Sequence, residues 1–113
     1  MADERTYSPE RDENCIAFMH RVIQDQPERE PLHIVEQLVE IVIGELKGSP
    51  CEISATGSNK SLTVKLHHSG RPIDDRLVLI MYDHTDRVEY NSDGYNGWWL
   101  TLRRDIPKLF IAH

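Results

Sequence analysis

CEISATGSNKSLTVKLH, residues 51–67, is the stretch of sequence that decides the fold class. On both sides of residues 57–60 apolar side chains alternate with polar ones, and this period of two is typical of strands that bury one face. The residues between the two runs include glycine, serine and asparagine, which favour tight turns. We therefore predict an antiparallel hairpin formed by residues 51–56 and 61–67.

A helix is predicted directly before this hairpin, from about Leu32 to Lys47. Its apolar side chains recur at helical spacing, so they form one stripe on the helix surface. Gly48 and Pro50 then end the helix. The stripe contains Val35, Leu38, Val39, Val42 and Leu46.

An earlier helix is predicted to begin at Ser8-Pro9-Glu10. Serine caps helices, proline suits the first helical position, and an acid suits the positive end of the helix dipole. The helix should end near Gln26, because Pro27 disfavours helical geometry in the residue before it.

The sequence after residue 70 is compatible with two structures. Residues 73–81 could form a helix capped by its acids, or a buried strand. By propensity, residues 88–90 and 98–102 around the turn 92–94 would form a second hairpin.

These elements predict an α+β fold, a two-layer sandwich of helices packed on a mixed or antiparallel sheet. The alternative is two helices on a four- or five-stranded antiparallel meander. The length of 113 residues suits one domain. We assign residues 8–113 to that domain and expect residues 1–7 to be a frayed N-terminus.

Composition narrows the function classes. With 39% hydrophobic and 28% charged residues, the chain resembles an ordinary soluble globular protein. A net charge of −6 argues against nucleic acid as a partner, because such binding requires a surplus of Lys and Arg. No apolar run is long enough for a membrane span, and the polar start lacks a signal peptide. We expect a cytoplasmic protein without a membrane partner.

Cysteines and histidines give no metal site by spacing. Cys15 and Cys51 are too few for a disulfide framework, so we expect two buried, reduced thiols. His67 and His68 are adjacent on a predicted strand, so their side chains should point to opposite faces and not chelate one ion. We expect no metal, no cofactor and no catalytic residues.

Three segments share the order and spacing of a known set of motifs. They are Glu40–Pro50, His68–Asp74 and Gly97–Ile106, and they resemble the nucleotide-binding boxes of the histidine-kinase-type (GHKL) ATPases. That family includes sensor kinases and anti-sigma-factor kinases. The resemblance implies a helix layer on a mixed sheet, and it implies that the third segment enters a helix.

The residues that would hold nucleotide in that family are replaced here. Gly44 stands in place of the magnesium-binding asparagine, and His68 in place of the aspartate that reads adenine. Pro72 replaces a glycine of the second box. Trp99 puts an indole where backbone amides should approach phosphate. The resemblance therefore implies a scaffold that has lost its nucleotide ligands.

A degenerate scaffold of this kind suggests a small, non-enzymatic regulatory protein that binds another protein. The resemblance implies a signalling or transcription component as partner, such as a kinase, a response regulator or a sigma factor.

The candidate contact residues are the aromatic side chains Tyr90, Tyr95, Trp98 and Trp99. Adjacent tryptophans cannot easily both be buried on one face of an element, so we expect one to pack in the core. The other should be partly exposed, and exposed aromatic side chains are enriched at interface hot spots. The alternative function is a self-associating structural module of unrelated α+β fold, in which the same aromatics build a homodimer interface or the core.

Overall fold

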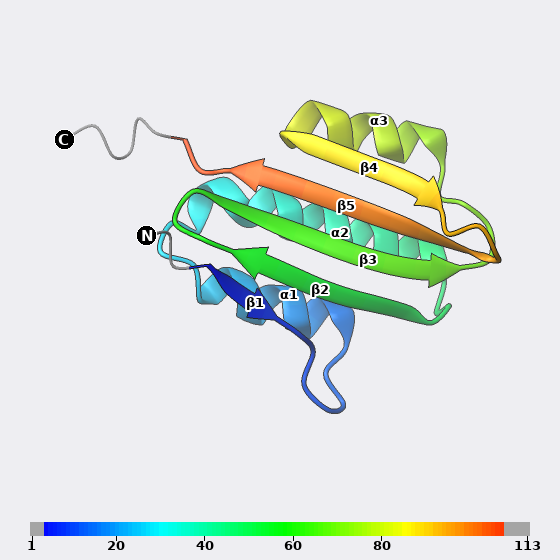
Figure 1. Ribbon diagram of the computed structural model, residues 1–113, viewed down its shortest axis with the longest axis horizontal. Coiled ribbons are helices and arrows are strands. Elements are labelled where there is room, and N and C mark those ends of the chain that lie inside the picture. Colours follow the sequence, from blue (N-terminus) through cyan, green and yellow to red (C-terminus); the bar gives the residue numbers. More distant parts are fainter. Residues whose placement is uncertain (1–3, 108–113) are drawn as a thin grey trace.

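The computed structural model describes residues 4–107, which form three α-helices packed on one face of a five-stranded antiparallel sheet (Figure 1). The helices are α1 (Cys15–Gln24), α2 (His33–Leu46) and α3 (Asp75–His84), with a short 3₁₀ turn at Glu30–Leu32. The strands are β1 (Arg5–Tyr7), β2 (Cys51–Gly57), β3 (Ser61–Ser69), β4 (Arg87–Ser92) and β5 (Gly97–Asp105).

The predicted α+β sandwich is confirmed, with an antiparallel sheet. The strand order is β1-β2-β3-β5-β4, so the sheet is not a simple meander. Strand β5 pairs with β3 along its whole length, and β4, which precedes β5 in the chain, lies outside it at the edge. The central pair, β3 and β5, is therefore formed by strands that are far apart in the sequence, with α3 and β4 between them.

The first hairpin is confirmed with the predicted faces. Ile53 pairs with Leu66 and Ala55 pairs with Val64, and all four side chains are buried against the helices. The second hairpin is also confirmed, since β4 and β5 pair around the turn that contains Gly94.

Most of the segment 73–81 lies in helix α3 (Asp75–His84), so it takes one of the two structures that the sequence allowed. The side chain of Asp74 caps α3 by accepting a hydrogen bond from the Arg76 amide at 2.8 Å. Leu77 and Met81 lie one turn apart and are buried. The acid before the apolar run therefore distinguishes this segment from a strand.

The first helix begins later than Ser8. Asn14 is its cap, and its Oδ1 accepts a hydrogen bond from the Ala17 amide at 2.8 Å. Residues 8–14 are a connecting segment in which Asp12 has a φ of 67°. The prediction of a start at Ser8-Pro9-Glu10 was wrong, because an equally good cap lies closer to the buried positions.

The expectation that residues 1–7 are frayed is also wrong for Arg5–Tyr7, which pair with β2. The Tyr7 hydroxyl donates to Asp25 and accepts from Gln26 Nε2 at 3.2 Å, and Arg5 forms an ion pair with Asp25 at 2.7 Å. These contacts hold the edge strand against the end of α1. Residues 1–3 and 108–113, at the two ends of the assigned chain, lie outside the described residues.

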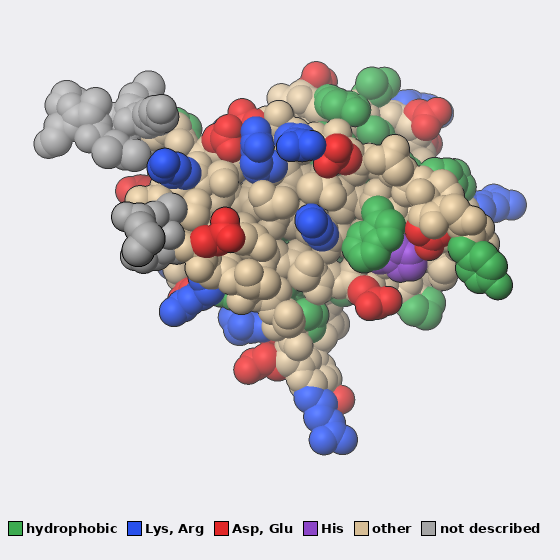
Figure 2. All heavy atoms as spheres, in the orientation of Figure 1, with side chains coloured by type: hydrophobic (Ala, Val, Ile, Leu, Met, Phe, Trp, Pro, Cys, Tyr) green, Lys and Arg blue, Asp and Glu red, His purple; other side chains and the backbone are tan. Residues whose placement is uncertain are grey.

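The core lies between the helices and one face of the sheet. Its largest fully buried side chains come from every layer, and they include Phe18, Met19, Leu38, Leu62, Leu66, Met81, Leu100 and Leu102. Among residues 4–107, no helix covers the other face of the sheet (Figure 1). Figure 2 shows this open face, where positive and negative side chains are interspersed over the strands.

Gly44 provides a simple stability test, because it is an exposed residue inside α2 whose added Cβ would meet no atom within 4 Å. Replacing it with alanine should raise the free energy of unfolding by about 1 kcal/mol, since glycine loses more backbone entropy in a helix. Urea denaturation would measure the change. As a control, Gly48→Ala should destabilise, because Gly48 has a φ of 83°. A loss of stability in Gly44→Ala would contradict the prediction.

Candidate functional site

The candidate site lies at the end of the sheet where β4 turns into β5. The row of paired residues Glu52, His67, Trp99 and Asn91 crosses the open face there. The neighbouring row of Cys51, His68, Trp98 and Ser92 crosses the helix-covered face. Successive residues of one strand therefore serve two different environments, as the alternation of a strand requires.

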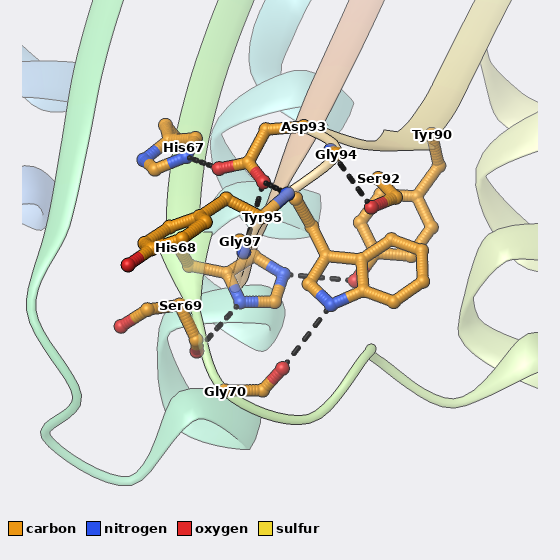
Figure 3. A network of polar contacts seen from close by, with 11 residues as sticks. His67, His68, Ser69, Gly70, Tyr90, Ser92, Asp93, Gly94, Tyr95 and Gly97 are labelled. Atoms are coloured by element: carbon orange, nitrogen blue, oxygen red, sulfur yellow. Dashed lines mark hydrogen bonds and ion pairs between the residues drawn. The ribbon is translucent and has the colours of Figure 1, made fainter.

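On the helix-covered face, His68 is 1% exposed and belongs to a hydrogen-bonded network (Figure 3). The Ile73 amide donates to the Tyr90 hydroxyl at 2.9 Å, and that hydroxyl lies 2.8 Å from His68 Nε2. His68 Nδ1 lies 3.2 Å from the Ser69 carbonyl, which can only accept. The network thus assigns the proton of the neutral ring to Nδ1 and lets Tyr90 donate to Nε2.

Trp98 covers this network at the end of the sheet. Its ring stacks on Tyr90 with centroids 5.2 Å apart, and its Nε1–H donates to the Gly70 carbonyl at 3.1 Å. Burial raises the pKa of the Tyr90 phenol, although its hydrogen bond with the Ile73 amide opposes the shift. Tyr90, Trp98 and His68 are therefore one packed unit that joins β3, β4, β5 and the loop before α3.

On the open face, Trp99 is 49% exposed and stands beside His67, with ring centroids 4.7 Å apart. His67 Nε2 in turn lies 2.8 Å from Asp93 Oδ2. Tyr95, at the tip of the β4–β5 turn, is 96% exposed. We call these four residues, His67, Asp93, Tyr95 and Trp99, the Trp99 surface. Figure 2 shows hydrophobic side chains beside a histidine at this end of the sheet.

Asp93 organises the turn that carries the Trp99 surface (Figure 3). Its Oδ1 accepts hydrogen bonds from the Tyr95 amide at 2.7 Å and the Gly97 amide at 3.1 Å. A Cβ on Gly97 would approach the Asp93 carboxylate and His67 Nε2 too closely for ordinary contact. A larger residue at position 97 would force the Asp93 and His67 side chains to move, so phosphate binding is not needed to explain the glycine.

The pKa of Asp93 is lowered from its usual value near 3.8, first by the hydrogen bond with His67 and then by the Tyr95 amide. A carboxylate with a lowered folded-state pKa stabilises the fold fully above its unfolded pKa, and the contribution is lost as pH falls through the folded value. We expect the melting temperature to fall on acidification below about pH 4. In Asp93→Asn this part of the acid-dependent loss should be smaller. Equal acid sensitivity in both proteins would contradict the assignment.

The four aromatic residues predicted as contact residues do not share one surface. Tyr90 is half-buried, with its hydroxyl bonded to His68 and Ile73, and Trp98 is half-buried on the helix-covered face. The assignment of the four as partner-binding residues stays a prediction, and Tyr95 and Trp99 are its more exposed members.

His67 and Asp93 belong to the surface but were missed by sequence analysis. The alternation of side chains along β3 could have identified His67, because it places His67 on the other face of the sheet from His68. Asp93 precedes a glycine in the turn, which marked it as a turn former and nothing more.

The three segments that resemble nucleotide-binding boxes have ordinary structural roles. Gly44 lies exposed on α2, and His68 is buried under Trp98 and Tyr90. The helix implied for the third segment is wrong, because residues 97–105 form strand β5. A cavity of about 540 Å³ lies between the first two segments, lined by residues such as Glu45, Arg71 and Asp74, but neither Gly44 nor His68 lines it.

No protein-family model matches this chain, and no curated protein matches it. Within residues 4–107, no helix has the length and apolar composition needed to cross a bilayer. The same residues contain no group of three or more His, Cys, Asp or Glu side chains placed to hold a metal ion. The similarity to GHKL proteins stays a prediction from the sequence.

Proposed function

We propose that this chain is a small, non-enzymatic regulatory protein that binds another protein through the Trp99 surface. The observation that carries the proposal is the exposure of Trp99 on a sheet face that no helix covers. Large aromatic side chains surrounded by a polar rim are typical of interface hot spots. Here the rim includes His67, Asp93 and Glu52.

The geometry favours a rigid contact. Asp93 fixes the turn through two backbone hydrogen bonds and also bonds to His67, which packs on Trp99. A surface whose side chains are already held in place loses less entropy when it binds. The mechanism that we propose is stoichiometric occlusion, in which the open face covers a functional surface of the partner.

Charge on the open face supports a protein partner over nucleic acid. This face carries charges of both signs, namely Lys65, Arg87 and Arg103 together with Glu52, Glu89 and Asp105. A mixed pattern of this kind does not provide the positive stripe that phosphate backbones require. The sequence resemblance suggests a signalling or transcription protein as the partner, such as a kinase, a response regulator or a sigma factor. We propose the cytoplasm as its compartment.

Site-specific photo-cross-linking in the source cells would test the proposal. A photoreactive benzoylphenylalanine placed at Tyr95 should give a covalent adduct with another protein. The adduct should disappear when Trp99→Ala is added, because loss of a hot-spot side chain weakens binding by about 30-fold or more. The same probe at Ile41, which is 49% exposed on α2, is the matched control. An adduct at Tyr95 that survives Trp99→Ala would overturn the proposal.

The loss of nucleotide binding has its own test. Isothermal calorimetry with ATP and Mg²⁺ should show no tight complex, because Gly44 offers no side-chain oxygen as a ligand and His68 is bonded within the fold. A tight, magnesium-dependent ATP complex would exclude the degenerate-scaffold interpretation.

A second candidate function is self-association through the β4 edge. Leu79 and Tyr82 are 62% and 56% exposed on α3, and α3 lies beside the edge strand β4 (Figure 1). Two copies of β4 paired antiparallel about Val88 would place Arg87 of each copy opposite Glu89 of the other. Opposite charges in directly paired positions stabilise a sheet, and a two-fold interface repeats each pair.

Charge reversal would decide whether this dimer forms. Light scattering should show a dimer for the wild type and a monomer for Arg87→Glu and for Glu89→Arg. A mixture of the two variants, or the double variant, should restore the dimer because the pairs again carry opposite charges. A monomeric wild type at high concentration would exclude this candidate, and so would a dimer that neither reversal affects.

A further inference from the structure

Cys15 and Cys51, which lie 36 positions apart in the chain, have their Sγ atoms 3.1 Å apart. Cys15 is the first residue of α1 and Cys51 is the first residue of β2. Both are free thiols and both are half-buried, so they are more exposed than the expected two buried thiols. Contact between two thiols this far apart in sequence requires the helix layer and the sheet to meet at this point.

The two thiols are also reachable from solvent. A surface cavity of about 480 Å³ is lined by both of them, together with Pro9, Asn14 and Ile43 among others. A cavity of this size can admit a small thiol reagent. The connecting segment 8–14 forms one wall, so the pair lies at the junction between that segment and the folded layers.

We propose that Cys15 and Cys51 are a reactive dithiol site, which a low-molecular-weight disulfide such as oxidised glutathione converts into an intramolecular disulfide. The bond would join the start of α1 to the start of β2. It is independent of the Trp99 surface and of any protein partner.

The order of the two steps follows from the surroundings of each thiol. Burial, and then the contact with Cys15, raise the pKa of the Cys51 thiol to about 12, so Cys51 is protonated at neutral pH. Cys15 is the first residue of α1 and follows directly on the connecting segment 8–14, which lines the cavity beside it. Cys15 is therefore the thiol that attacks first.

The chemistry is a pair of thiol–disulfide exchanges. The Cys15 thiolate, after giving its proton to solvent, attacks one sulfur of the small disulfide and releases one small thiolate. Cys51 then loses its proton to solvent and attacks Cys15 Sγ, which breaks the mixed disulfide and releases the second small thiolate. Both released thiolates take up protons. Two protein S–H groups are oxidised to one S–S bond, and the small disulfide is reduced to two thiols.

Little movement is needed to close the bond. A disulfide has an S–S length of about 2.05 Å, so the sulfur atoms must approach by about 1 Å. Cys15 follows directly on the connecting segment 8–14, whose backbone is not part of a helix or strand. Closure can therefore use the end of that segment without disturbing the pairing of β2 with β3.

Oxidation with glutathione followed by intact-mass measurement tests the proposal. Treating the full chain with oxidised glutathione should remove the mass of two hydrogen atoms and leave no thiol for alkylation. Peptide mapping should recover Cys15 joined to Cys51. Because the closed loop is long, the melting temperature should rise by about 10 °C relative to the reduced protein.

The single variants Cys15→Ala and Cys51→Ala are the matched controls. Each should retain glutathione as a stable mixed disulfide or stay reduced, and neither should gain thermal stability on oxidation. Their melting temperatures in reductant show whether they fold. Two outcomes would overturn the proposal. One is a wild-type protein that keeps both thiols free. The other is a wild type that accumulates only mixed or intermolecular disulfides.

Discussion

Trp98→Ala should lower the free energy of unfolding by about 2–3 kcal/mol, whereas Trp99→Ala should lower it by less than about 1 kcal/mol. Trp98 stacks on Tyr90 and donates to the Gly70 carbonyl, so its removal exposes the His68 network and leaves that carbonyl unpaired. Trp99 packs mainly on His67 and is 49% exposed.

Urea denaturation of both variants would measure this difference, and the two residues control for each other because they are adjacent on one strand. If Trp99 binds a partner, its alanine variant should keep its fold and lose the cross-link at Tyr95. Equal destabilisation by the two changes would contradict the assignment of the two faces.

Tyr90→Phe should cost about 2 kcal/mol although it removes a single oxygen atom. That hydroxyl accepts from the Ile73 amide and donates to His68 Nε2, and phenylalanine leaves both groups without their partner. An unsatisfied buried polar group costs about 1–3 kcal/mol. The ring stack on Trp98 is retained in the variant, so the loss reports the hydrogen bonds and not the packing.

Tyr82→Phe is the matched control, because Tyr82 is 56% exposed. It should change stability by no more than about 0.5 kcal/mol. Thermal and chemical denaturation would measure both variants, and a Tyr90→Phe protein as stable as Tyr82→Phe would show that the network contributes nothing.

A periodic pattern of apolar residues was sufficient to predict a helix or strand from the sequence. The alternation in residues 51–67 predicted the hairpin, and the stripe around Leu38 and Val42 predicted α2. The start of α1 was missed because Ser8 and Asn14 are equally good caps, and only the burial of Phe18 and Met19 selects the later one. Strand β1 was missed because its three residues are held by partners on β2 and α1.

The sequence predicted which aromatic residues lie near the candidate site, but it did not predict how their side chains are arranged. The sequence indicated that one tryptophan would pack and the other would be exposed. Which one was exposed depended on the register of β5 against β3, a tertiary property that places Trp98 opposite His68 and Trp99 opposite His67. The pairing of β4 with β5 places Tyr90 within a strand and leaves Tyr95 in the turn. The segment that resembled a nucleotide-binding helix is the central strand β5.

The placement of two adjacent tryptophans on opposite faces of β5 also gives the protein two separate optical reporters. In Trp99→Phe, the remaining indole is Trp98, whose fluorescence should follow the opening of the packed unit with Tyr90. In Trp98→Phe, the remaining indole is Trp99, whose emission and quenching by acrylamide should respond when the open face is covered. The fluorescence of Trp98 thus reports unfolding, and the fluorescence of its neighbour Trp99 reports docking of a partner.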